Sequence, residues 1–175
     1  MKQLIKIIYI FLLCFTAITS HALSNEKVLL WGPTFYGMTM DEVLHNIAGA
    51  KRLDSTESFT TDKVAKDLVK LDDVVISGEK FNVILKFKND LLKEVQLTLI
   101  PNSLIINTDL YANLSWLLSL KYGPPVKSTR QEFGPPATTW QAQWVKNMMN
   151  IDLFSDKNNI QIKYTTRYLD DLKNL

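Results

Sequence analysis

From Phe81 to Phe87, and again from Glu94 to Leu99 beyond Asn89-Asp90, the chain alternates apolar and more polar residues with a period of two. Successive side chains of a β-strand point to opposite faces, so this alternation predicts two antiparallel strands with one buried face and one wet face. The apolar positions are Phe81, Val83, Leu85 and Phe87 on the first strand, and Val95, Leu97 and Leu99 on the second. Helices are expected to cover the buried face.

A helix is predicted to begin after Thr39. Glu42 follows Thr39 by three residues, which is the spacing of a capping box, in which each side chain accepts the backbone N–H of the other residue. Gly49 is a plausible C-terminal stop. The apolar stripe has the spacing of one buried helical face and comprises Met40, Val43, Leu44 and Ile47. Residues 27–31 read as a short strand before this helix, and residues 51–62 read as a loop after it.

A further strand is predicted at 68–76, with a bulge at Asp72-Asp73. The same order of elements then recurs. A second helix carries Leu110, Leu114, Leu117 and Leu118 on one face and stops at Gly123. A strand is predicted at 125–132, at the edge of the sheet, because proline is tolerated at an edge better than at the centre. Strands at 138–145, 148–154 and 160–165 follow. The pattern predicts an α+β fold of two tandem helix-plus-three-strand units, 23–103 and 104–175, packed as one globular domain with antiparallel sheet covered on one face by helices.

The segment 1–22 has the three parts of a secretory signal peptide. Lys2 and Lys6 precede an apolar run, and Ser20-His21-Ala22 is a small-x-small cleavage site. The run is shorter than the roughly 20 apolar residues of a membrane span. Cys14 lies inside the apolar run behind a large residue, not at the cleavage point, so lipidation is not expected. We therefore predict a periplasmic protein beginning at Leu23, with secretion as the alternative.

Cleavage changes the composition of the chain. Loss of Lys2 and Lys6 lowers Lys plus Arg from 20 to 18, which equals the 18 Asp and Glu residues. A neutral chain with scattered charges gives no electrostatic reason to expect nucleic acid as a partner. Cys14 is the only cysteine, so disulfides are not expected in the mature chain. The mature protein is not expected to span the membrane.

The segment Gly37-Met38-Thr39-Met40-Asp41-Glu42-Val43, closed by Gly49, resembles the helix opening of the small outer-membrane lipoprotein family that includes BamE. That family is similar in its helix-plus-sheet unit to the β-lactamase inhibitor proteins, which carry two such units in tandem. The segment Leu120 to Pro125 looks like the matching end of the second helix. The resemblance implies a periplasmic α+β interaction module without catalysis.

Few residues carry catalytic chemistry. His45 is the only histidine after the signal segment, and a metal site needs further ligands beside it. A serine nucleophile would need His45 as its base, and no Gly-x-Ser-x-Gly elbow is present. Hydrolysis by two carboxylates stays open as a third hypothesis; the adjacent pairs Asp72-Asp73 and Asp170-Asp171 read as turn or solvent residues. We predict no enzyme activity, no cofactor and no metal.

The aromatic residues point to binding instead. Trp140 and Trp144 share one face of a predicted strand, and they form either the core beneath the second helix or an exposed ridge, depending on which face that helix covers. The leading hypothesis is a protein-binding module of the bacterial envelope, with an inhibitor or immunity protein for an envelope hydrolase as its narrower form. Its predicted partner surface comprises Phe35, Tyr36, Phe133, Trp140 and Trp144. The alternative is a small-molecule or lipid-binding protein with a cavity between sheet and helices, lined by Phe81, Leu85, Phe87, Trp140 and Trp144.

Overall fold

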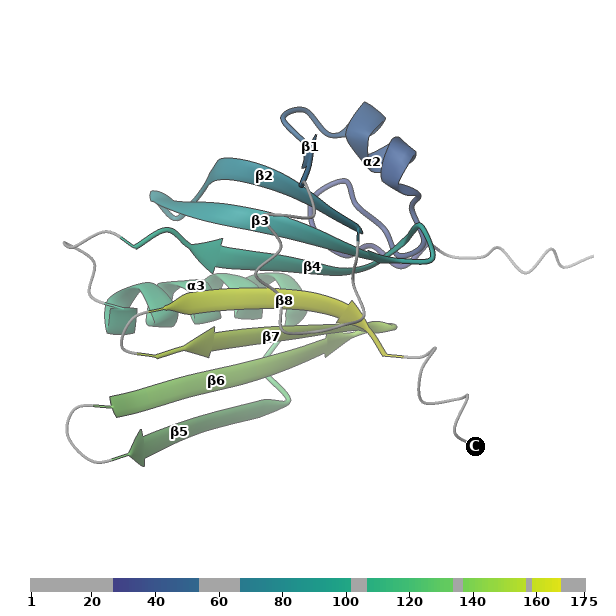
Figure 1. Cartoon of the computed structure of the whole chain (residues 1–175). Coiled ribbons are helices and arrows are strands. Elements are labelled where there is room, and N and C mark those ends of the chain that lie inside the picture. Colours follow the sequence, from purple (N-terminus) through teal and green to yellow (C-terminus); the bar gives the residue numbers. More distant parts are fainter. Residues whose placement is uncertain (1–26, 54–66, 102–106, 134–136, 157–158, 168–175) are drawn as a thin grey trace, which may run out of the picture.

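The computed structural model describes residues 27–53, 67–101, 107–133, 137–156 and 159–167. These residues form an α+β fold with two helices and one open antiparallel sheet (Figure 1). The helices are α2 (Met40–Asn46) and α3 (Asn107–Tyr122). The strands are β1 (Lys51–Arg52), β2 (Asp67–Ile76), β3 (Glu79–Lys88), β4 (Leu91–Leu99), β5 (Lys127–Phe133), β6 (Ala137–Lys146), β7 (Met149–Ser155) and β8 (Ile160–Thr166).

The sheet is continuous across both halves of the chain. Its eight strands are arranged in the order β1-β2-β3-β4-β8-β7-β6-β5, so that β4 from the first half pairs with the final strand β8. Antiparallel partners that face each other have side chains on the same face of a sheet. One such row crosses five strands and is buried throughout: Val83, Leu97, Ile162, Leu153 and Ala142. The predicted buried face is therefore confirmed, and it extends over both halves.

The capping box at the start of α2 is confirmed. The Glu42 carboxylate accepts the backbone N–H of Thr39 at 2.8 Å, and the Thr39 hydroxyl accepts the backbone N–H of Glu42 at 3.2 Å. Met40, Val43 and Ile47 are buried in the core cluster, and Leu44 packs against it partly buried. The helix ends at Asn46 with Ile47 as its C-cap, so Gly49 does not stop it as predicted. Gly49 lies in the turn after the helix and has a φ of +81°, a conformation that glycine adopts without a Cβ clash.

The irregular positions of the sheet also follow the sequence. The register of the β2–β3 pair shifts between Leu71 and Val74, where Asp73 has a φ of +54°. This is the predicted bulge. Asn89 and Asp90 both have positive φ, as the two-residue turn between β3 and β4 requires. The prolines before Lys127 precede β5, which lies at the edge of the sheet as predicted.

Helix α3 lies behind the C-terminal strands in Figure 1 and contacts β6 and β7. Leu110, Leu114 and Leu118 are buried, as the apolar stripe predicts, but Leu117 is 38% exposed. The prediction that Leu117 belongs to the buried face is wrong. Residues 110, 114 and 118 repeat every fourth position, and Leu117 lies one helical position, about 100°, away from Leu118.

Two other expectations need correction. Residues 27–31 do not form a strand; Leu29 makes an isolated bridge to Phe35, because the chain reverses at Gly32 and the backbone N–H of Leu30 is donated to the carbonyl of Thr34. The predicted loop at 51–62 begins instead with β1, which pairs with β2. The first helix is therefore followed by four strands, not by three; the second helix is followed by the four strands predicted for it, so neither half is a helix-plus-three-strand unit. The predicted signal segment and the tail after Arg167 lie outside the described residues.

Candidate functional site

Trp144 belongs to the core. Its side chain is 0% exposed, and it is the largest of the fully buried side chains. The indole Nε1 is buried and has no hydrogen-bond acceptor among the described residues. Trp144 is thus unavailable to a partner in this conformation. Of the two alternatives, its side chain belongs to the core and not to an exposed ridge, so its place on the predicted partner surface is wrong.

Trp140 lies on the same face and is partly buried. Its ring is 6.0 Å from that of Tyr111 on α3, centroid to centroid, and the Arg130 guanidinium on β5 lies 5.9 Å from the Trp140 ring. Burial raises the pKa of the Tyr111 phenol. The tryptophan face of β6 is therefore the face that α3 covers, and Gln141, which is exposed, points to the other side.

The other predicted surface residues have different neighbours. Phe35 and Tyr36 are half-buried against the core, and each ring carries an ammonium group: Lys27 Nζ lies 4.1 Å from the Phe35 centroid, and Lys93 Nζ lies 4.2 Å from that of Tyr36. Lys93 Nζ also donates to the Tyr36 hydroxyl at 2.6 Å. The backbone of Phe133 pairs with Ala137 at the end of β5, and its side chain lies outside what the structure describes. Within the described part of the chain, no ring stacking or cation–π contact joins Phe35 or Tyr36 to Trp140.

The outer side of α3 carries an apolar surface that the sequence interpretation missed. Trp116 is 58% exposed, Leu117 is 38% exposed and Leu120 is 66% exposed. Residues 116 and 120 are separated by four positions and residues 117 and 120 by three, so the three side chains are neighbours on the helix surface. We call this set the α3 outer patch. A helix with apolar residues on both sides was visible in the sequence, since Trp116 and Leu120 lie off the buried stripe.

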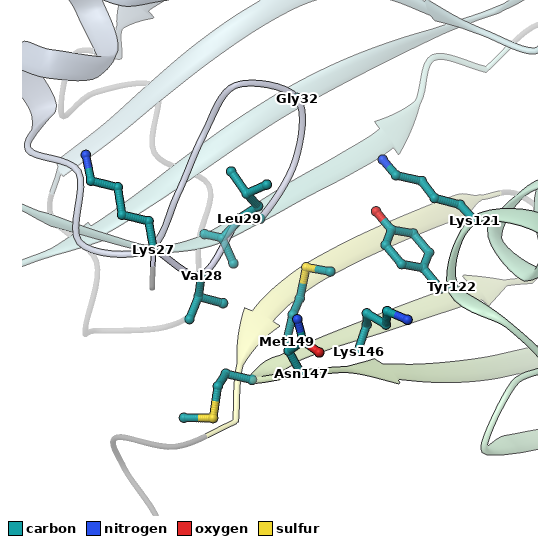
Figure 2. A pocket seen from close by; sticks show the side chains of 11 residues that line it. Lys27, Val28, Leu29, Gly32, Lys121, Tyr122, Lys146, Asn147 and Met149 are labelled. Carbon is teal, nitrogen blue, oxygen red and sulfur yellow. The ribbon is translucent and has the colours of Figure 1, made fainter. Parts of the chain in front are cut away.

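A pocket of about 270 Å³ lies where three segments meet (Figure 2). These segments are residues 27–32, the end of α3 and the turn between β6 and β7. The chain turns at Gly32 and at Asn147, both of which have positive φ and line the pocket. Its apolar lining comprises Val28, Leu29, Leu30, Tyr122, Met148 and Met149. This is not the cavity expected from the sequence, because Phe81, Leu85, Phe87 and Trp144 are buried together in the core cluster.

The groups weighed for catalysis are dispersed. His45 is exposed on α2, and the Glu42 carboxylate beside it is engaged in the capping box. Asp72 and Asp73 form ion pairs with Lys70 and Lys80 at 2.6 and 3.4 Å. Among the residues placed by the structure, no group of three or more His, Cys, Asp or Glu side chains is arranged to hold a metal ion. Asp170 and Asp171 lie outside those residues.

Comparisons with family models, with curated proteins and with solved structures find no match to this chain. Within the described ranges neither helix is long and apolar enough to cross a bilayer.

Proposed function

We propose that this chain is an exported, non-catalytic protein-binding module of the bacterial envelope, built from two tandem helix-plus-strand units whose helices cover one face of the sheet. Residues 1–22 support export, through the signal-peptide pattern described above. The element order, with a helix before four strands in each half, supports the two-unit description. The narrower role, an inhibitor or immunity protein for an envelope hydrolase, rests on the likeness of this organisation to the β-lactamase inhibitor proteins.

The α3 outer patch carries the proposal. The sheet covers the side of α3 that carries Leu110, Leu114 and Leu118, whereas the patch on its other side is exposed, and an exposed apolar patch marks a surface for a partner. Exposed tryptophan is the residue type most enriched among interface hot spots, since it buries a large area on binding. Trp116 and Leu120, four residues apart, have the spacing with which a helix anchors in an apolar groove of a partner. Lys121 lies next to Leu120 at the border of the patch, where its ammonium group could pair with acidic residues at the rim of that groove.

A photo-crosslinking experiment in the producing bacterium tests this proposal. A photoreactive amino acid at position 120 is expected to yield one adduct with a different envelope protein, identified by mass spectrometry. The matched control carries the same group at Val75, which is 63% exposed on β2 and distant from α3 in the strand order. Trp116→Ala is expected to weaken the complex by at least about 2 kcal/mol, the cost of a hot-spot truncation.

The proposal would be wrong if position 120 yields no adduct, or if its only adduct is a second copy of this chain. An unchanged affinity in Trp116→Ala would equally exclude the patch as the contact surface. N-terminal sequencing of the processed protein tests the export step, and we expect it to begin at Leu23.

A further inference from the structure

The pocket beside α3 combines an apolar interior with a one-sided charge. Figure 2 shows Val28 and Leu29 on one side of the pocket, and Lys121, Tyr122 and Lys146 on the other. Leu29, which lines the pocket, is 62% exposed. The apolar lining of this pocket is in contact with water. A ligand that covered it would remove apolar surface from water, which favours binding.

Three lysines, Lys27, Lys121 and Lys146, line the pocket, and none of the described residues that line it is acidic. The Lys27 ammonium lies over the Phe35 ring and that of Lys121 lies 5.1 Å from the Tyr122 ring centroid. Among the described residues, none of the three ammonium groups forms an ion pair with a carboxylate. The chain as a whole is close to neutral after removal of its first 22 residues, so this concentration of positive charge is local.

We propose that the pocket binds a single-chain anionic amphiphile, with the alkyl chain against the leucine and methionine side chains and the carboxylate or phosphate head at the lysines. The volume of about 270 Å³ holds about nine groups the size of a water molecule, each about 30 Å³ in the liquid. An alkyl chain of medium length has this size. The lysines then orient the amphiphile by attracting its anionic head. A cationic head on the same alkyl chain would be repelled by them.

Calorimetric titration of the purified protein with decanoate, below its micelle concentration, measures this binding. We expect one saturable site per chain. Decyltrimethylammonium, with the same chain length and the opposite charge, and butyrate, with the same head and a short chain, are expected to bind at least about tenfold more weakly. Higher salt should weaken decanoate binding, because exposed charges are screened. Equal binding of the cationic compound, or the absence of saturation, would overturn the proposal.

Substitutions at exposed positions locate the site without disturbing the core. The double variant Lys121→Glu/Lys146→Glu and the single variant Leu29→Glu are each expected to weaken decanoate binding at least about tenfold. Lys51→Glu makes the same exchange at one lysine of β1, which lies at the opposite side of the strand order from β6, and should leave the affinity unchanged. Trp116→Ala should also leave it unchanged, which separates this site from the protein-binding patch.

Methionine methyl resonances give a readout that does not depend on variants. The chain has five methionines. Met148 and Met149 line the pocket, although Met149 also belongs to the buried core, whereas Met38 and Met40 are buried in the core and do not line the pocket. Decanoate is expected to shift the first two methyl signals and to leave the other two in place. Shifts spread evenly over all four would show non-specific binding and would refute the assignment.

Discussion

Replacing Trp144 by alanine tests the placement of its side chain in the core. A buried tryptophan removes roughly 150–250 Å² from solvent, which at about 25 cal/mol per Å² corresponds to about 4–6 kcal/mol. This figure is an upper bound, because the unfolded chain already buries part of its apolar surface. We therefore expect Trp144→Ala to lower the free energy of unfolding by about 3–5 kcal/mol, the usual range for such truncations.

Trp144→Phe isolates the contribution of the indole N–H. This donor has no acceptor among the described residues, and a buried unpaired donor costs about 1–3 kcal/mol. Phenylalanine retains most of the aromatic area and removes the donor, so part of the packing loss is offset. We expect the free energy of unfolding to fall by less than about 1.5 kcal/mol, as for core exchanges that remove only a few atoms.

Urea denaturation followed by far-ultraviolet circular dichroism measures both variants, since tryptophan fluorescence itself changes with the substitution. Trp116→Ala is the matched control: the same exchange at a position that is 58% exposed should change the free energy of unfolding by less than about 0.5 kcal/mol. If Trp144→Phe destabilises as much as Trp144→Ala, the N–H makes a stabilising hydrogen bond and the reasoning fails. If Trp144→Ala behaves like Trp116→Ala, the core placement is wrong.

Three further predictions concern stability. Thr39→Ala should lower the free energy of unfolding by about 1 kcal/mol, because α2 loses its capping box; Thr39→Ser should restore most of it, as urea denaturation would show. Burial, aided by the hydrogen bond with Tyr122, raises the pKa of Tyr164. Above about pH 10 only the unfolded chain then loses this proton, so the free energy of unfolding should fall by up to about 1.4 kcal/mol per pH unit. Thermal denaturation between about pH 9 and about pH 11 should show a smaller slope in Tyr164→Phe, and an unchanged slope would contradict the assignment. Lys86 and Glu94, 2.7 Å apart with side chains 19% and 21% exposed, should show a coupling of about 0.5–1 kcal/mol in a double-mutant cycle, decreasing with salt.

The elements that could be predicted are those whose causes are local. The capping box needs only residues three positions apart, and the alternation on β3 needs only a period of two. The bulge at Asp72-Asp73 was readable because two acids interrupt an apolar run. The strand expected at residues 27–31 failed because a strand needs a partner, and the chain there reverses at Gly32 instead.

The candidate sites required distant segments to be placed together. Alternation on β6 separates Trp144 from Gln143, but it does not say which of these two faces α3 covers. The pocket joins residues 27–32 to residues 146–149, a proximity that no local pattern encodes.

Residue patterns were therefore sufficient for the fold class, the wet and buried faces of β3 and β4 and the start of α2, because steric and hydrogen-bonding rules act over a few residues. Only the packed structure decided that the tryptophan face of β6 lies beneath α3, that Trp116 and Leu120 lie outside, and that β4 pairs with β8. Those choices depend on how apolar surfaces from both halves of the chain are buried against each other, and that burial is a property of the whole molecule.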